Sequence, residues 1–306
     1  MMLSDDSSLS KDDRDEVSNQ ARLALLRADA LGIFPTPVDE IMRAAKIEVV
    51  PFVLDETYLA KLRRKAEQAG RALLSAISKV WGVFDPHARV AFIDPDTPKE
   101  KLPFLKLHEG GHAMLPWQSI FGHFEDCRKT LDPDTKAAFE RQANVFASDV
   151  LFQLDQFTSD AHDLPFGIDA VLRLAKRYGA SLYSTARRYA AVHERACAVM
   201  VFNPVEIHAD FGAIAMLRRV ETSPRFDERF GAFAWPEWVS TKDPVGKLIP
   251  FSRMTRPRSF AMRDRNGAQQ EFVGEAFKTS HQILILIHAL EAQTGRLVVP
   301  AQPVLI

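Results

Sequence analysis

The spacing of apolar residues predicts two helices and a strand near the N-terminus. From Val17 to Leu31 the apolar positions recur at helical intervals, and Gly32 ends that pattern. A short helix is predicted to begin near Pro37, followed by a strand over Ile47–Val53, where β-branched residues predominate. Residues 1–16 carry too few large apolar side chains to offset the entropy of ordering, so a flexible tail is predicted there.

The next apolar runs predict a hairpin and two long helices. Two strands are predicted to pair around the turn sequence Asp-Pro-His, at Val80–Phe84 and Arg89–Ile93. Helical periodicity returns over Lys99–Leu115, where Pro116 ends it, and again over Pro133–Leu154 after a polar stretch. We therefore expect an α+β domain of helices on a small twisted sheet, with Arg89–Ile93 as an edge strand that pairs with an extended peptide.

The second half of the chain changes from helical to strand-like patterns. Two helices are predicted over Ile168–Arg177 and Leu182–Val192, separated by Tyr178-Gly179-Ala180. After Cys197, strand-like apolar runs at 197–207, 281–290 and 297–306 alternate with loops rich in Pro, Gly and Arg, which indicates a domain boundary near residue 196. The predicted organisation is a tail at 1–16, a first domain at 17–160, a helical segment at 161–196 and a C-terminal α/β domain at 197–306.

Composition narrows the class of protein without identifying it. The 39 Lys and Arg residues nearly cancel the 40 Asp and Glu residues, so binding to nucleic acid or an acidic membrane would need a local patch. Two cysteines, Cys127 and Cys197, are fewer than a disulfide-stabilised secreted protein uses. The sequence shows neither a secretory signal nor an apolar run near the ~20 residues of a membrane span. A soluble, cytoplasmic protein is expected.

A His-Glu-x-x-His motif, His108-Glu109-Gly110-Gly111-His112, carries the strongest chemical signal. On a helix, positions i and i+4 share a face, so both imidazoles can point at one ion while Glu109 reaches a water beside it. Zinc is the ion expected in such a site, with Mn²⁺ as the alternative, and it lowers the pKa of bound water towards neutrality. The motif therefore predicts metal-dependent hydrolysis with Glu109 as the base.

A catalytic zinc of this type needs a third protein ligand. Glu140, on the second predicted helix, is the best candidate. Asn144 lies four residues later on the same helix face and is placed to hold a ligand imidazole by hydrogen bonding. Glu125 and Asp126, between the two helices, are alternatives for the third ligand.

Three pieces of the chain, PVDEIMRAAKIEVV, LKLHEGGHAMLP and FERQANVFASDVLF, resemble the ImmA/IrrE family of bacterial metallopeptidases in order and spacing. The resemblance covers about residues 18–195. In that family a Glu-x-x-Ala-Asn-x-Phe-Ala helix supplies the third ligand, which corresponds to Glu140 here, with Asn144 as the motif asparagine. The resemblance implies a zincin-like, gluzincin-type domain, a helix-turn-helix-like segment and a C-terminal GAF-like sensor domain.

The resemblance also implies a regulatory function. Members of this family cleave a helix-turn-helix transcriptional repressor and so switch on DNA-damage, mobile-element or antiphage-defence genes. By this resemblance the chain is expected to be a zinc endopeptidase that acts on such a repressor when a DNA-damage-related signal is present.

Two residues between the long helices are further candidates for roles at this site. His123 is a candidate for stabilising the oxyanion of the reaction, and an exposed loop histidine is the alternative. The thiolate of Cys127 would be able to occupy the open position on zinc and keep the enzyme inactive, with a free loop cysteine as the alternative.

Two basic segments are candidates for contact with DNA. The turn before Arg187 and Arg188 suits either a helix-turn-helix DNA reader or packing against the peptidase domain. A second cluster has Phe260 among its arginines, which suits single-stranded DNA because bases stack on aromatic rings while phosphates pair with Arg. A solvated loop is the alternative for this cluster, which consists of Arg253, Arg256, Arg258, Arg263 and Arg265.

Three classes of function therefore compete. The first, a regulatory peptidase, is favoured. The second is a non-haem iron enzyme, which also uses two His and a carboxylate, but such enzymes rarely place both His at i and i+4 with Glu between them. A DNA-binding transcriptional regulator with an inactive metal site is the third class.

Overall fold

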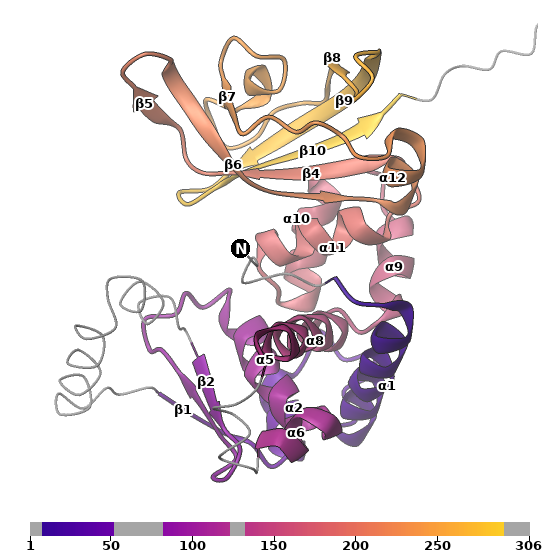
Figure 1. The fold of residues 1–306 in the computed structure, drawn as a ribbon, viewed down its shortest axis with the longest axis vertical. Helices are drawn as coiled ribbons and strands as arrows, with labels where there is room; N and C mark the ends of the chain where they lie inside the picture. Colours follow the sequence, from indigo (N-terminus) through magenta and orange to yellow (C-terminus); the bar gives the residue numbers. More distant parts are fainter. Residues whose placement is uncertain (1–7, 52–81, 123–131, 291–306) are drawn as a thin grey trace, which may run out of the picture. The chain divides into compact units, whose positions relative to one another are not determined.

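The computed structural model describes residues 8–51, 82–122 and 132–290, and the chain divides into two compact units, Met1–Tyr189 and Ala190–Ile306. The described part of the first unit combines helices with a three-stranded sheet, and that of the second is built on a larger antiparallel sheet (Figure 1). The mixed α and β composition agrees with the prediction.

The N-terminal helix begins earlier than the sequence pattern indicated. α1 spans Lys11–Arg27, and the Oγ atom of Ser10 caps it by accepting a hydrogen bond from the Asp13 amide at 3.2 Å. Acidic residues in this first turn are also favourable beside the positive end of the helix dipole. Residues 11–16, expected in a flexible tail, are therefore helical because capping stabilises a turn that has little apolar surface. α2 follows at Val38–Ala44.

The small sheet has the order β1-β3-β2, with β1 at Glu48–Pro51, β2 at Gly82–Asp85 and β3 at Val90–Ile93. The predicted hairpin of β2 and β3 is present, but the prediction that Arg89–Ile93 is an edge strand is wrong. β3 pairs antiparallel with β2 and parallel with β1, so both of its sides are hydrogen-bonded. Ala91 and Ile93 of this strand are buried, as suits a central position.

The helices predicted from the patterns at Lys99–Leu115 and Pro133–Leu154 lie side by side (Figure 1). α5 spans Leu102–Met114 and α8 spans Pro133–Leu151. The expected polar stretch after α5 starts with a short helix, α6 (Pro116–Gly122), because proline is well tolerated in the first turn of a helix.

Gly110 and Gly111 in the middle of α5 permit close packing on two sides. A Cβ added at Gly110 would lie 2.8 Å from the sulfur of Met42 in α2. A Cβ added at Gly111 would lie 3.2 Å from the ring of Phe146 and 3.4 Å from the Cα of Ala143, both in α8. The glycine pair is therefore what allows α5 to fit between its neighbours.

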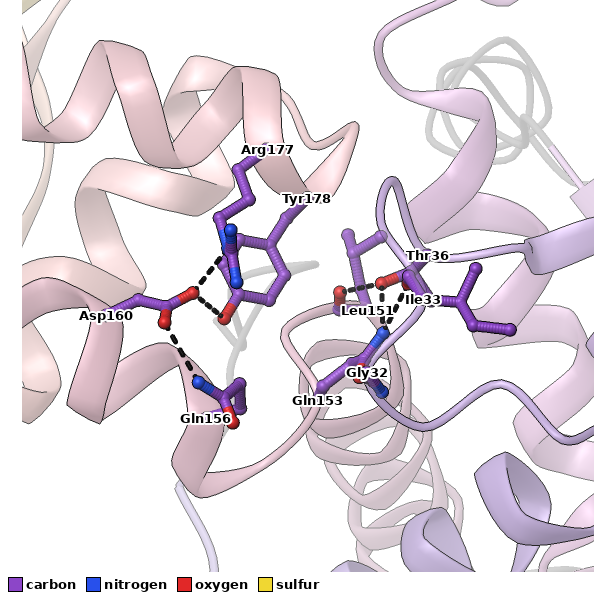
Figure 2. A network of polar contacts seen from close by, with 9 residues as sticks. All are labelled: Gly32, Ile33, Thr36, Leu151, Gln153, Gln156, Asp160, Arg177 and Tyr178. Atoms are coloured by element: carbon purple, nitrogen blue, oxygen red, sulfur yellow. Dashed lines mark hydrogen bonds and ion pairs between the residues drawn. The ribbon is translucent and has the colours of Figure 1, made fainter.

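α8 ends three residues earlier than predicted and a separate helix, α9 (Asp155–His162), follows it. Gln153 and Leu154 have positive φ values of 50° and 58° at the break. Figure 2 shows how tertiary contacts fix this turn: the Gln153 amide donates to the Ile33 carbonyl at 2.8 Å and accepts from the Gly32 amide at 2.7 Å. Thr36 also donates to the Leu151 carbonyl, at 2.8 Å.

The helices α10 (Ile168–Tyr178) and α11 (Leu182–Val192) agree with the sequence pattern. The Asp160 carboxylate on α9 accepts from the Tyr178 hydroxyl at 2.8 Å and pairs with Arg177 at 2.6 Å, which ties α9 to α10 (Figure 2).

The sheet of the second unit has the order β5-β6-β4-β10-β9-β8, and β7 pairs with β6. One face forms an apolar core that includes Phe202, Phe226 and Phe272. The strand-like runs after Cys197 appear as β4 and β5 and the run near residue 285 as β10, whereas the run predicted at 297–306 lies outside the described residues. The elements are β4 (Cys197–Phe202), β5 (Glu206–His208), β6 (Gly212–Thr222), α12 (Pro224–Phe230), β7 (Trp238–Ser240), the 3₁₀ turn η1 (Gly246–Leu248), β8 (Arg258–Arg263), β9 (Gln269–Lys278) and β10 (Ile283–Ala289).

None of the helices in the described ranges has both the length and the apolar character needed to cross a membrane.

Candidate metal centre

The structure brings His108, His112 and Glu140 together. The helical repeat of α5 places both imidazoles on one face, and α8 lies beside that face with Glu140. The Nε2 atom of His108 is 3.3 Å from Glu140 Oε2, and the Nε2 atom of His112 is 3.9 Å from Glu140 Oε1. One candidate ligand atom from each residue lies within 4.8 Å of the other two.

This geometry fits a metal ion with nitrogen and oxygen ligands. Donor atoms at about 2 Å from a tetrahedral zinc ion are separated by about 3.3 Å, which is close to the distances between these side chains. Two neutral imidazoles and one carboxylate form the donor set of a catalytic site for a divalent ion. The three residues that sequence reasoning proposed as ligands can therefore hold such an ion.

Electrostatic coupling between His108 and Glu140 shifts the pKa of both groups. Burial by itself lowers the pKa of His108, but the hydrogen bond to Glu140 and the negative charges of Glu109 and Glu140 outweigh it and raise the pKa above 6.5. Burial also raises the pKa of Glu140, but the hydrogen bond to His108 and the charge of His112 lower it to about 2. A proton on His108 and a divalent ion would therefore compete for the same atoms.

Glu109 is buried beside this site and lies against the small sheet. Its side chain is 7% exposed. A Cβ added at Gly82 of β2 would lie 2.8 Å from Glu109 Oε1, so the absence of a side chain at Gly82 leaves the space that the carboxylate occupies. The candidate base is therefore positioned by contact between α5 and the backbone of β2.

A buried glutamine network, which sequence reasoning missed, contacts His112. Gln118 on α6 accepts at its Oε1 atom, 2.8 Å from His112 Nδ1. Its Nε2 atom donates to Gln142 Oε1 at 2.8 Å and to the Phe139 carbonyl at 3.1 Å, and Trp117 Nε1 donates to Gln142 Oε1 at 2.8 Å. The sequence offered only two uncharged polar residues on helices near the motif, with no signal that both are buried.

The other imidazole has a different environment. Asn144 is buried on α8, and its side-chain hydrogen bond contributes to the raised pKa of His108. The Nδ1 atom of His108 is itself buried and has no hydrogen-bond partner of good geometry among the described residues. His112 thus has a well-oriented hydrogen bond at Nδ1, whereas the contact between Asn144 and His108 does not supply one at Nδ1 of His108.

The other candidate residues from the sequence lie either outside the described residues or away from this cluster. His123, Glu125, Asp126 and Cys127 lie outside the described residues. Arg188 forms an ion pair with the buried carboxylate of Asp149 at 2.8 Å, which is a packing role.

The predicted arginine cluster lies in the second unit on and around β8, an edge strand of the described sheet. Arg258 and Arg263 are at the two ends of β8, and the guanidinium of Arg253 lies 5.0 Å from the ring centroid of Phe277. All five arginines, including Arg256 and Arg265, are exposed.

Comparisons with known proteins bear on the fold and on the family of the segment that contains this cluster. A solved structure of a Mycobacterium tuberculosis transcriptional regulator is similar over 96% of this chain and 96% of its own, with 14% identity and a TM-score of 0.53, which shows a shared fold. No curated protein matches the chain. Residues 76–189 match the family model described as the IrrE N-terminal-like domain, Peptidase_M78, and this segment contains all three candidate ligands. The first unit of the chain therefore contains a domain of the ImmA/IrrE family of metallopeptidases.

Proposed function

We propose that the chain is a zinc-dependent endopeptidase that cleaves a helix-turn-helix transcriptional repressor. The observation that carries this proposal is the convergence of His108, His112 and Glu140, with Glu109 buried beside them, in a domain of a metallopeptidase family. The repressor as substrate rests on the family resemblance. The name of the similar solved structure, a transcriptional regulator, is in keeping with a regulatory role.

In this proposal His108, His112 and Glu140 hold the ion, and the bound ion supplies Lewis-acid polarisation of the scissile carbonyl and of water. Glu109 accepts the proton of the attacking water at its carboxylate and delivers it to the leaving amine nitrogen. Asn144 restrains the orientation of His108.

The free side of β2 is the proposed binding edge for an extended substrate. β2 has β3 as its one neighbour in the described sheet, and its residue Gly82 abuts Glu109. A peptide that adds to this edge would gain main-chain hydrogen bonds next to the candidate base.

The test combines the purified chain with the helix-turn-helix protein encoded beside it, in the presence of zinc or manganese, and follows cleavage by mass spectrometry. We expect one cut that a chelator abolishes, and no cut with Glu109→Gln although that variant still binds metal. An intact partner under all of these conditions would contradict the peptidase proposal. Bound iron with oxygen consumption would instead favour the non-haem iron enzyme, and metal and DNA binding without cleavage would favour a regulator with an inactive site.

We further propose that the second unit is the sensor, GAF-like as the resemblance implies, and binds single-stranded DNA. A shallow hollow of about 550 Å³ is lined by Phe251, Arg253 and Lys278, and the ring of Phe251 is fully exposed. An exposed aromatic ring and two cations that line the same hollow suit base stacking with neutralisation of phosphates. Fluorescence anisotropy with a labelled oligothymidine tests this: Phe251→Ala with Arg253→Gln should weaken binding about tenfold or more, and equal binding by variant and parent would refute it.

A further inference from the structure

The hydrogen bonds around Gln118 have two fixed points that determine their direction. The indole N–H of Trp117 can only donate, and the main-chain carbonyl of Phe139 can only accept. The atom of Gln142 that lies 2.8 Å from Trp117 Nε1 is therefore its carbonyl oxygen. The atom of Gln118 that lies 2.8 Å from this oxygen and 3.1 Å from the Phe139 carbonyl must be its amide nitrogen.

This orientation of Gln118 determines which nitrogen of His112 carries hydrogen. The remaining polar atom of Gln118 is its carbonyl oxygen, 2.8 Å from His112 Nδ1, so Nδ1 must be the donor. The neutral ring then has its lone pair on Nε2, the atom that faces Glu140 at 3.9 Å. A metal ion needs a lone pair at this atom.

Burial makes the arrangement difficult to reverse. Gln118 is 5% exposed and Gln142 is 8% exposed, so water cannot readily replace a lost partner. Rotation of the Gln118 amide would set its nitrogen against the N–H of His112 and its oxygen against two acceptors, leaving buried groups unsatisfied.

We infer that Gln118 is a positioning residue, held by Gln142 and Trp117, that fixes His112 as a ligand through Nε2 before any metal arrives. This inference rests on the proposed metal site. The two ligand histidines would then differ, because Nδ1 of His108 has no such partner in the described part of the chain.

The first experiment reads the tautomer directly in the metal-free protein. Nitrogen-15 NMR of labelled histidine, at a pH where His112 is neutral, should show hydrogen at Nδ1 and none at Nε2. Hydrogen at Nε2, or an even mixture of the two forms, would overturn the inference. This readout does not depend on peptidase activity or on the identity of the metal.

The second experiment compares two buried glutamines. Gln118→Met removes the contact to His112, and Gln153→Met removes a buried amide whose partners are far along the chain from the site, the backbone of Gly32 and Ile33. Competition with a chromophoric chelator should show zinc affinity about ten- to a hundredfold weaker for Gln118→Met and within about twofold of the parent for Gln153→Met. Equal losses in both variants, or no loss in the first, would contradict the inference.

Two further results keep the outcomes separate. If Gln118→Met does not fold, Trp117→Phe replaces it as the test. This variant leaves Gln118 in place but releases Gln142, so zinc binding about threefold weaker than in the parent is expected. A parent protein that binds no divalent ion while His112 still has hydrogen at Nδ1 would refute the proposed function and leave the positioning of the imidazole correct.

Discussion

Two buried glutamines, Gln142 in α8 and Gln153 just beyond its end, belong to hydrogen-bond networks that end in different groups. The Gln142 network leads through Gln118 to the side chain of His112. The network of Gln153 ends on the backbone of Gly32 and Ile33 (Figure 2). A network that ends on backbone groups fixes the path of the chain, and one that ends on an imidazole sets the state of a chemical group. Loss of the first should change stability, and loss of the second should change metal binding.

The largest expected effect comes from replacing the candidate base, which should change cleavage but not folding. Glu109→Gln keeps the shape of the side chain that lies against Gly82 but removes the proton acceptor. Cleavage should fall about a thousandfold while zinc affinity and the urea midpoint stay close to those of the parent. Cleavage within tenfold of the parent would mean that another residue is the base.

A second change should affect stability alone. Gln153→Met removes the donor to the Ile33 carbonyl and the acceptor for the Gly32 amide. Because buried groups would lose their partners, the free energy of unfolding in urea should fall by about 3 kcal/mol. A loss of zinc affinity comparable to that of Gln118→Met would show that the two networks are not distinct.

A third change acts on the contact between the sheet and the candidate base. Gly82→Ala would place a methyl group 2.8 Å from Glu109 Oε1 and displace the carboxylate. We expect kcat to fall about tenfold with zinc affinity unchanged, measured by cleavage of the proposed repressor substrate and by chelator competition. An unchanged kcat would indicate that the carboxylate moves away from β2 during the reaction.

The smallest effect is the pH dependence of the metal-free protein. The pKa of His108 is raised above 6.5 in the folded state. The stability that protonated His108 contributes to the folded chain is therefore fully present below pH 6.5 and is lost as pH rises through the folded-state pKa. The pKa of Glu140 is lowered from 4.5 to about 2, so its stabilisation is lost as pH falls through that interval.

The free energy of unfolding of the metal-free chain in urea should therefore decline above pH 6.5, and only slightly, because Glu140 is partly exposed. Zinc affinity should change in the opposite sense and increase with pH, since the ion displaces the proton from His108. Stability of the metal-free form that increases steadily from pH 6 to pH 8 would contradict this coupling.

The sequence predicted what depends on local spacing. The three candidate ligands follow from the i and i+4 rule and from a recognisable helix motif, and the helices α10 and α11 follow from periodicity interrupted by Gly179. The hairpin of β2 and β3 is local in the same sense.

What the sequence did not predict depends on contacts between distant segments. The parallel pairing of β1 with β3 has no local signal, so the sequence pattern predicts β3 as an edge strand. The break after α8 is held by hydrogen bonds from Gln153 to a loop more than a hundred positions earlier in the chain. Gln118 and Gln142 acquire their role through burial, which residue type alone predicts poorly because glutamine is usually exposed.

Gly110 and Gly111 have a consequence for the selectivity of the centre. Each glycine costs about 1 kcal/mol of helix propensity relative to alanine, and neither carries a functional group. The candidate ligands come from two helices, so the width of the cage that they would form for an ion depends on how closely the backbones of α5 and α8 approach at Gly111. A methyl group there would spread the cage and favour ions of larger radius, which makes the choice of metal a property of helix packing as well as of the ligands.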